Sequence, residues 1–263
     1  MLKYNVYIFF FISIVLISGC VSQPQPENAQ NFNNSSIRQT NHLSNTSPIQ
    51  TSFTKTNSYL GTPCEPNHNL KFPNDITDSG KILKITPTSL IASKMQDRAW
   101  LWIDTSKTNK VPIYSPVDAD LVRGVYKISK SINTIDYDLH FQVSCEVWFY
   151  INHISDPVEK IKTVFPDKPA NNTSILTQIN PPIHFKAGDL IGYTTGTYQA
   201  HNFDFAVFDL NHTNNLIGDA QNLDPRFKNF ICPFDVFPSN LKDIYYKKLD
   251  PQLISESNCE DKG

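Results

Sequence analysis

The polar residues best suited to chemistry lie on a strand that the sequence predicts for residues 202–207. Side chains of a strand point alternately to its two faces, so this segment presents one apolar row and one polar row. The apolar row, which is expected to face a core, consists of Phe203, Phe205 and Val207. The polar row places the Asn202 amide beside the Asp204 carboxylate, where a half-buried sheet could display a ligand or a metal ion. The alternation alone favours a simpler interpretation, an edge strand with a solvated face.

Aromatic side chains form a second candidate surface. They lie on strand faces opposite the expected core rows, at Trp100, Trp102, Trp148 and Tyr150. In an exposed groove such rings can stack on sugars or hold a peptide. Beneath a second layer of structure they would be ordinary core residues, which is the favoured interpretation for any one of them.

Strands are the elements expected to position these residues. The patterns at 81–86, 99–104 and 111–128 predict strands, and glycines at Gly188 and Gly196 predict turns ahead of the 202–207 strand. The clearest alternation covers residues 138–155, which indicates one strand or two strands joined by a tight bend. The sequence therefore predicts a mainly β fold with antiparallel sheets.

Two further elements are expected outside this pattern. Residues 158–165 are predicted to form a short strand, and Ser239 is expected to cap a short helix at about 240–249. That helix lies in the irregular part of the chain that follows Leu210.

Several segments resemble the core domain of the lysostaphin-type (M23) zinc endopeptidases, which cut the peptide cross-bridges of cell-wall peptidoglycan. The resemblance rests on Gly188-Asp189-Leu190-Ile191-Gly192 with the strand that follows it, and on Ile151-Asn152-His153-Ile154-Ser155. A proline-containing segment also matches, through Pro112, Tyr114, Pro116, Asp118 and Val122. In that segment Asp120 replaces a family glycine, and aspartate tolerates a left-handed turn better than most residues.

The resemblance covers about residues 100–210 and implies a specific architecture. It implies antiparallel sheets arranged as an M23-like (lipoyl/biotinyl-hybrid-like) β barrel-sandwich. One domain is then expected at 61–263, with the M23-like core at about 100–210. Because the family core does not require the residues that follow, 211–263 are expected to form a C-terminal extension held by a disulfide.

The same resemblance implies a metal site whose histidines are mostly replaced. In the family the zinc ligands are a histidine and an aspartate in His-x-x-x-Asp and the second histidine of His-x-His. Asp104 matches the aspartate, but Trp100 stands in place of the first histidine. Asn202 and Asp204 stand in place of the two histidines of His-x-His, whereas the other catalytic histidine is retained as His153.

The surviving groups favour a non-catalytic domain. The metal candidates, Asp104 and Asp204, are hard oxygen donors, whereas zinc prefers nitrogen and sulfur ligands and an indole has no lone pair to offer. His153 remains the catalytic candidate, although a lone histidine is more often an ordinary polar residue. The sequence therefore predicts no cofactor, with zinc expected only if the domain is an active metalloendopeptidase.

Two other histidines are not expected to serve the site. Aligning His201 with the family would shift the strand by one residue and turn Asp204 into the core, which the strand alternation opposes. His184 has no counterpart in the family and is expected at the surface.

The N-terminus predicts export and lipid attachment. Lys3 and the apolar run at 6–17 precede Leu16-Ile17-Ser18-Gly19-Cys20, which resembles a prokaryotic lipobox. The resemblance implies a signal peptide at 1–19 and a lipid such as palmitate on Cys20, with a plain membrane-anchor helix as the alternative. Residues 20–60 are dominated by polar residues and proline, which is typical of a disordered tether.

The cysteines other than Cys20 predict disulfides in an exported chain. The candidates are Cys64, Cys145, Cys232 and Cys259, and spacing leaves three pairings open. We expect Cys145 to pair with Cys232, and Cys64 to pair with Cys259.

The net charge of the chain limits the kinds of partner that it can bind. The net charge of −2 offers no basic face for nucleic acid. We therefore expect an extracytoplasmic lipoprotein on the cell membrane or outer membrane, of a bacterial or an archaeal envelope, that binds or regulates peptidoglycan or an envelope protein. Two alternatives stay open: an active metalloendopeptidase using Asp104, His153 and Asp204, and a structural lipoprotein that binds nothing specific.

Overall fold

The computed structural model describes residues 56–57, 60–67, 70–104, 110–129, 134–171, 175–197, 200–218 and 225–259, all within the unit Ser52–Gly263. The predictions for the signal peptide at 1–19, for lipid attachment at Cys20 and for the tether as far as residue 55 lie outside these residues. In the described part of the chain, no helix has the length and apolar composition needed to span a membrane.

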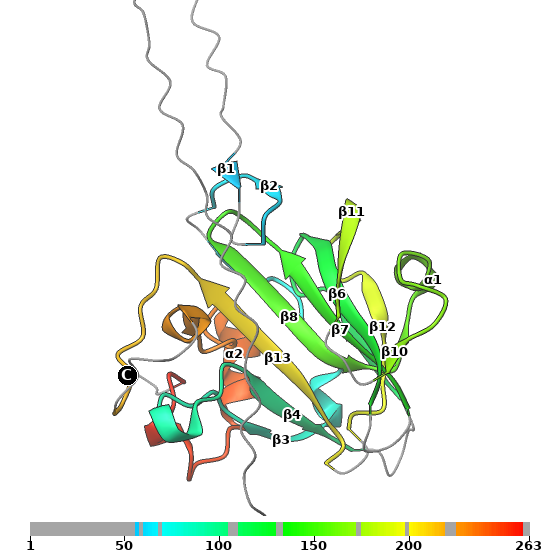
Figure 1. Cartoon of the computed structure of the whole chain (residues 1–263). Coiled ribbons are helices and arrows are strands. Elements are labelled where there is room, and N and C mark those ends of the chain that lie inside the picture. Colours follow the sequence, from blue (N-terminus) through cyan, green and yellow to red (C-terminus); the bar gives the residue numbers. More distant parts are fainter. Residues whose placement is uncertain are drawn as a thin grey trace, which may run out of the picture. The chain divides into compact units, whose positions relative to one another are not determined.

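A large, mainly antiparallel sheet dominates the described residues. It has nine strands in the order β10-β6-β7-β8-β13-β4-β3, with β11 paired to β6 and β14 paired to β13. The strands are β3 (Ile82–Thr86), β4 (Ala99–Ile103), β6 (Ala119–Ser129), β7 (Thr134–Gln142), β8 (Val147–Ile154), β10 (Ala170–Asn171), β11 (Leu176–Phe185), β13 (Asn202–Asp209) and β14 (Phe230–Ile231). Figure 1 shows β7, β8, β13 and β4 side by side, which is the part of the sheet that carries the candidate site.

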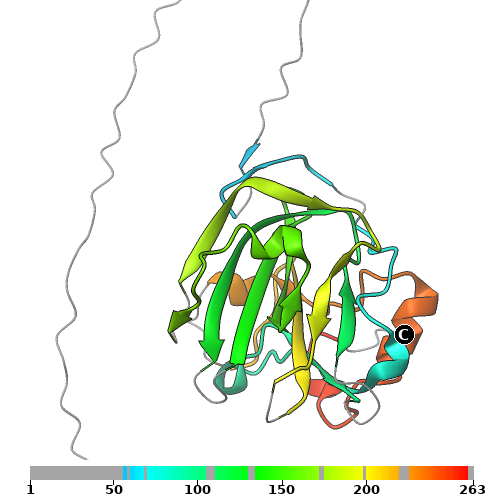
Figure 2. The same cartoon turned by 90° about the vertical axis from the view of Figure 1, so that its right-hand side faces the viewer.

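Two smaller sheets and a few short helices complete the fold. The smaller sheets are β1 (Thr56–Asn57) with β2 (Pro63–Cys64), and β5 (Val111–Tyr114) with β12 (Leu190–Thr194) and β9 (Asp156–Pro157). The α-helices are α1 (Glu159–Lys162) and α2 (Ser239–Tyr246), and the 3-10 helices are η1 (Ser79–Lys81), η2 (Ala92–Lys94), η3 (Pro225–Lys228) and η4 (Ile254–Glu256). Figure 2 views the fold from the side of α1 and β12. The fold is therefore mainly β with antiparallel sheets and a short helix near the C-terminus, as the sequence predicted.

One face of the large sheet buries the main hydrophobic core. The row predicted to face it does so, because Phe203, Phe205 and Val207 are fully buried there. Residues of the C-terminal extension close this core, since Phe205 packs near the rings of Phe234 and Phe237 at 6.5 and 6.3 Å between centroids. The extension is thus part of the folded unit.

A second, smaller cluster covers one end of the opposite face. Trp148 stacks on Phe208 with 3.8 Å between ring centroids, and Tyr150 and Phe230 are buried beside them. Trp148 and Tyr150 are therefore core residues, whereas Trp100 keeps 37% of its surface exposed. The remaining end of this face is polar and forms the candidate site.

Three local predictions need correction. Residues 158–165 form a helical turn, α1 at Glu159–Lys162 followed by a turn, instead of a strand, because Ile161 and Phe165, four residues apart, bury the same side. Pro238, not Ser239, is the N-cap of α2, and it makes no side-chain cap bond. Asp120 lies within β6 in extended conformation, whereas Gly188 and Gly196 do adopt left-handed backbone with φ of 87° and 69°.

The cysteines pair differently from the expectation. The disulfides are Cys64–Cys145 and Cys232–Cys259, with Cα atoms 5.0 and 4.8 Å apart. The predicted pairs were wrong because Cys145 does not lie within a strand, as the alternation at 138–155 suggested. It lies in the turn between β7 and β8, where its N–H donates to the carbonyl of Glu65. A disulfide requires Cα atoms within about 7 Å, and Cys64, at the end of the neighbouring strand β2, is the cysteine within that distance of Cys145.

Candidate functional site

The polar end of the sheet owes its composition to an irregularity in β8. Strand β7 pairs Tyr137 with Ile154 and Leu139 with Ile151, so both Asn152 and His153 lie opposite the single residue between them. His153 adopts a left-handed conformation with φ of 69°. Such a bulge re-aims a side chain, and it turns His153 to the same face as Asn152 while Ile154 returns to the core.

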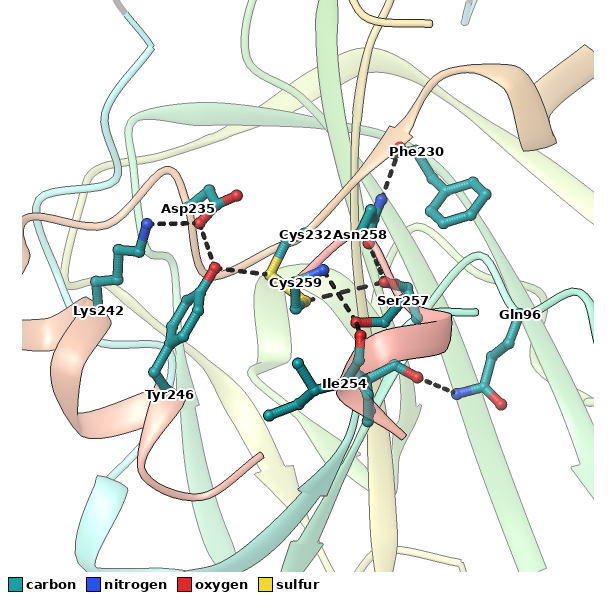
Figure 3. Close-up of a disulfide and its surroundings, with 12 residues drawn as sticks. Gln96, Phe230, Cys232, Asp235, Lys242, Tyr246, Ile254, Ser257, Asn258 and Cys259 are labelled. Atoms are coloured by element: carbon teal, nitrogen blue, oxygen red, sulfur yellow. Dashed lines mark hydrogen bonds and ion pairs between the residues drawn. A yellow bond between two sulfur atoms is a disulfide. The ribbon is translucent and has the colours of Figure 1, made fainter. Parts of the chain in front are cut away.

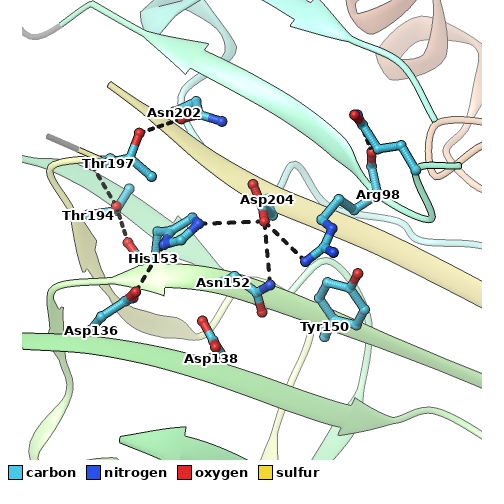
Figure 4. Close-up of polar contacts among 12 residues, drawn as sticks. Arg98, Asp136, Asp138, Tyr150, Asn152, His153, Thr194, Thr197, Asn202 and Asp204 are labelled. Atoms are coloured by element: carbon cyan, nitrogen blue, oxygen red, sulfur yellow. Dashed lines mark hydrogen bonds and ion pairs between the residues drawn. The ribbon is translucent and has the colours of Figure 1, made fainter. Parts of the chain in front are cut away.

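Asp204 is the centre of the resulting cluster (Figure 4). Its carboxylate is buried, and its Oδ2 atom lies 3.5 Å from His153 Nε2, 3.6 Å from Arg98 Nη1 and 3.4 Å from Asn152 Nδ2. Arg98 also contacts Asp97, which in turn accepts a 3.0 Å hydrogen bond from the Tyr150 hydroxyl. Oppositely charged groups therefore alternate along the cluster.

His153 is held between two carboxylates. Its Nδ1 lies 3.1 Å from Asp136 Oδ2, on the side opposite Asp204. Burial alone would lower the pKa of the imidazole, but the hydrogen bonds to Asp136 and Asp204 and their charges raise the pKa of His153 to about 10. At neutral pH His153 is therefore an imidazolium, with both ring nitrogens engaged as donors.

A second cation lies on the far side of Asp136. The Lys127 ammonium is bonded to Asp138 and lies 3.9 Å from Asp136 Oδ2. Burial raises the pKa of Asp138, as does the charge of Asp136, while Lys127 opposes the shift. The two buried carboxylates on β7 thus share the positive charges of Lys127 and His153.

The zinc site implied by the family resemblance does not fit these groups. Trp100 offers no lone pair, and β4 stays paired to β13 from Ala99 to Trp102, with Trp100 opposite Asp204. Asp104 therefore lies roughly 13 Å along the strand from the level of Trp100 and Asp204, and the two carboxylates do not converge. Asp136 and Asp204 raise the pKa of the retained His153, so a metal ion must displace a proton to bind its imidazole.

Only one group of three potential metal ligands occurs among the described residues. It consists of Asp136, Asp138 and His153, whose ligand atoms all lie within 4.8 Å of one another. Lys127 and the imidazolium already supply positive charge where a divalent ion would, so a metal must displace both the ammonium and a proton.

A pocket of about 430 Å³ opens beside this cluster. Its wall includes Trp100, His153, Asn202 and Asp204, together with Arg98. The pocket thus combines an aromatic ring with amide, guanidinium and imidazolium donors, which is a surface suited to binding a polar ligand.

The pocket is lined by two indoles, Trp100 and Trp102, which differ in how accessible they are to a ligand. The ring of Trp102 is covered by the Lys84 ammonium at 4.6 Å, and its Nε1 donates to Thr86 Oγ1 at 3.0 Å. Trp100 keeps more than a third of its surface exposed. Trp100 is therefore the ring available for stacking.

The structure brings together most of the residues singled out in the sequence. Trp100, His153, Asn202 and Asp204 line one pocket, and Asp104 does not. The edge-strand interpretation of the polar row was wrong, because β13 lies between β8 and β4 and both Asn202 and Asp204 are buried.

His201 and His184 lie away from the polar cluster. His201 precedes β13 in a left-handed conformation and is exposed. His184 is also exposed, and it contacts Asp120 at 2.8 Å.

Sequence reasoning missed the charged partners of His153. Arg98, Lys127, Asp136 and Asp138 are not among the motif residues that carried the family resemblance. One signal was present, because aspartates two residues apart at 136 and 138 share a face of any strand. The bulge that brings His153 to them left no such signal.

Comparison of the chain with protein families, with curated proteins and with solved structures finds no match.

Proposed function

We propose that this protein is an exported lipoprotein whose β domain binds a cell-envelope component, with peptidoglycan as the first candidate, and does not cut it. Support for export comes from the N-terminal sequence and from two disulfides, which persist in oxidising compartments. Support for the M23 resemblance comes from the common pocket of Trp100, His153, Asn202 and Asp204.

The observation that carries the proposal is the position of His153 between two carboxylates, Asp136 and Asp204. A general base must be neutral to accept a proton, and a metal ligand must be neutral to donate a lone pair. Asp136 and Asp204 hold His153 in its protonated form, at 3.1 and 3.5 Å from its two nitrogens. The site therefore offers charged and hydrogen-bonding groups for recognition but no activated nucleophile.

The pocket suits a ligand with both a flat apolar face and polar substituents. The exposed Trp100 ring supports stacking of a sugar ring or packing of a peptide, and Asn202 and Arg98 can serve polar substituents. Peptidoglycan carries both kinds of group.

A sedimentation assay with purified peptidoglycan tests the proposal. We expect the full chain to co-sediment with the wall material, without releasing peptides from it, in the presence of zinc, manganese or a chelator alike. If the chain stays in the supernatant, the proposal that it binds peptidoglycan is wrong and a structural role remains. One tightly bound zinc per chain would contradict the proposal that the domain is non-catalytic.

A metalloendopeptidase is the second candidate, and the Asp136, Asp138 and His153 group favours it. Besides their spacing, Asp136 Oδ1 and Asp138 Oδ1 are buried and accept no hydrogen bond from the described residues. This candidate requires metal-dependent release of wall peptides that disappears in Asp136→Asn. Wall material that stays intact with each added metal would exclude it.

A further inference from the structure

We propose that a second pocket, built by the C-terminal extension, binds a neutral, hydroxyl-rich ligand of the size of a sugar unit. The pocket has a volume of about 570 Å³, within the range of about 300–1,000 Å³ that holds small organic ligands. It shares no lining residue with the pocket of Trp100. The proposal for this pocket can therefore be refuted without affecting the proposal for the Trp100 pocket, and the reverse also holds.

Segments distant in sequence form the walls. One wall is the chain after β13, at Thr213, Asn214 and Asn215, and another is the Cys232–Cys259 disulfide with the adjacent Asn258 (Figure 3). The disulfide joins the end of β14 to the chain after η4. This covalent link holds Cys232 and Asn258 together in one wall.

The amides of the pocket are held in place by the backbone. Asn214 Nδ2 donates to the Phe230 carbonyl at 2.6 Å, and Asn258 Nδ2 donates to the same carbonyl at 3.1 Å. His212 Nε2 lies 3.1 Å from Asn214 Oδ1. Asn214 Nδ2 also donates to the Phe227 carbonyl at 3.3 Å, and the Asn258 amide oxygen accepts from Thr88, so these two side chains shape the wall. Thr213 and Asn215 complete the polar lining that a ligand meets. A wall held in this way favours binding, because little of it must be ordered when a ligand binds.

The charges at the rim are balanced. Lys242 Nζ lies 2.8 Å from Asp235 Oδ1 and 4.8 Å from the centre of the Tyr246 ring. The Tyr246 hydroxyl donates to the same Asp235 oxygen at 2.6 Å. Because the ammonium and the carboxylate neutralise each other, the lining favours a neutral ligand over an anion or a cation.

The lining also defines the chemical class of the ligand. The lining has more amide and hydroxyl side chains than aliphatic ones, which are Leu90 and Ile231. Amides and hydroxyls both donate and accept hydrogen bonds, which matches the hydroxyl groups of a sugar.

Saturation-transfer NMR on the full chain tests this site. The probes are glucose and N-acetylglucosamine as neutral sugars, with glucuronic acid and glucosamine as charged comparisons. We expect signals from the neutral sugars and weaker ones from the charged sugars. No transfer to either neutral sugar, or a stronger response to a charged one, would overturn the proposal.

A pair of tryptophan variants locates the binding. Asn215 is exposed on the pocket wall, so Asn215→Trp should fill the pocket and weaken sugar binding about tenfold or more, equivalent to about 1.4 kcal/mol. Asn240→Trp makes the same change at an exposed position of α2 outside the lining and should leave binding unchanged. Equal affinity in Asn215→Trp and the native chain would contradict the assignment, as would equal losses in both variants.

Discussion

His153 Nδ1 lies 3.1 Å from Asp136 Oδ2, and this contact ties the bulge of β8 to the neighbouring strand β7. Asp204 Oδ2 lies 3.5 Å from the other ring nitrogen, Nε2, so a single imidazolium joins β7, β8 and β13. His153 thus contributes to the stability of the sheet as well as to the wall of the pocket.

The stability of the protein should decrease in mildly alkaline solution. The pKa of His153 rises from 6.5 to about 10 on folding, so its contribution is fully present below about pH 6.5 and is lost as the pH rises through 10. We expect the free energy of unfolding to fall by roughly 3–5 kcal/mol across this window, measured by urea denaturation.

The variant His153→Gln is the control for this dependence of the free energy of unfolding on pH. Glutamine does not titrate, so the variant should be less stable than the native chain at pH 6.5 and should show little pH dependence up to pH 9.5. A native chain with a flat profile between pH 6.5 and 9.5 would show that the two carboxylates do not hold the proton.

Replacing Lys127 should destabilise the fold. Lys127→Met leaves Asp136 and Asp138 with only His153 to balance them, and breaking a buried ion pair costs roughly 3–5 kcal/mol. Because the Lys127 side chain keeps 20% of its surface exposed, we expect a value near the lower limit, measured by urea denaturation at pH 7.

A second substitution separates charge from packing in this pair. Adding Asp138→Asn to Lys127→Met removes the unbalanced carboxylate and should restore part of the lost stability. A double variant as unstable as the sum of both single variants would mean that the ammonium and the carboxylate do not interact.

Truncating Trp100 should weaken ligand binding without unfolding the domain. The ring lines the pocket and is 37% exposed, so Trp100→Ala should reduce affinity for peptidoglycan about tenfold and lower the free energy of unfolding by roughly 1–3 kcal/mol, which leaves the domain folded. The assay is co-sedimentation with purified wall material.

Tyr193→Ala is the matched control, because Tyr193 on β12 is also 37% exposed and does not line this pocket. It should bind peptidoglycan like the native chain. If both variants lost affinity equally, the Trp100 pocket would not be the binding site.

The two disulfides should differ in their contribution to stability. Cys64–Cys145 closes a loop of 81 residues and Cys232–Cys259 one of 27 residues. Since a longer closed loop restricts the unfolded chain more, removing the first bridge by serine substitution should cost about 1 kcal/mol more than removing the second. Peptide mapping should recover these two pairs, and recovery of Cys145 with Cys232 would contradict the structure.

Local patterns in the sequence predict much of the fold. The alternation in 202–207 identified the core row of β13. The pattern at 138–155 predicted one strand or two strands joined by a tight bend, and the structure has two, β7 and β8, without the sequence having located the turn at Cys145. Residues 158–165 were misassigned because their apolar side chains fit short strands and helical turns alike. Burial of Ile161 and Phe165 on one side selects the helix.

The site was less predictable because it depends on pairing between distant strands. Alternation would place His153 in the core row with Ile151, and only the bulge opposite β7 reverses this. The counter-charges Asp136 and Lys127 become neighbours through the register of β6 on β7. Disulfide pairing depends on the same tertiary contacts, which no spacing of cysteines reveals.

The Cys64–Cys145 bond also determines how the domain would respond to mechanical force. Once β1 has separated from β2, tension on the chain ahead of Cys64 is transmitted through the disulfide to the turn between β7 and β8, as well as along the backbone. Tension would therefore enter at one end of β8, the strand whose other end carries His153. In the oxidised protein, the Cys64–Cys145 bond therefore connects a force applied to the N-terminal segment with the strand that carries the candidate site.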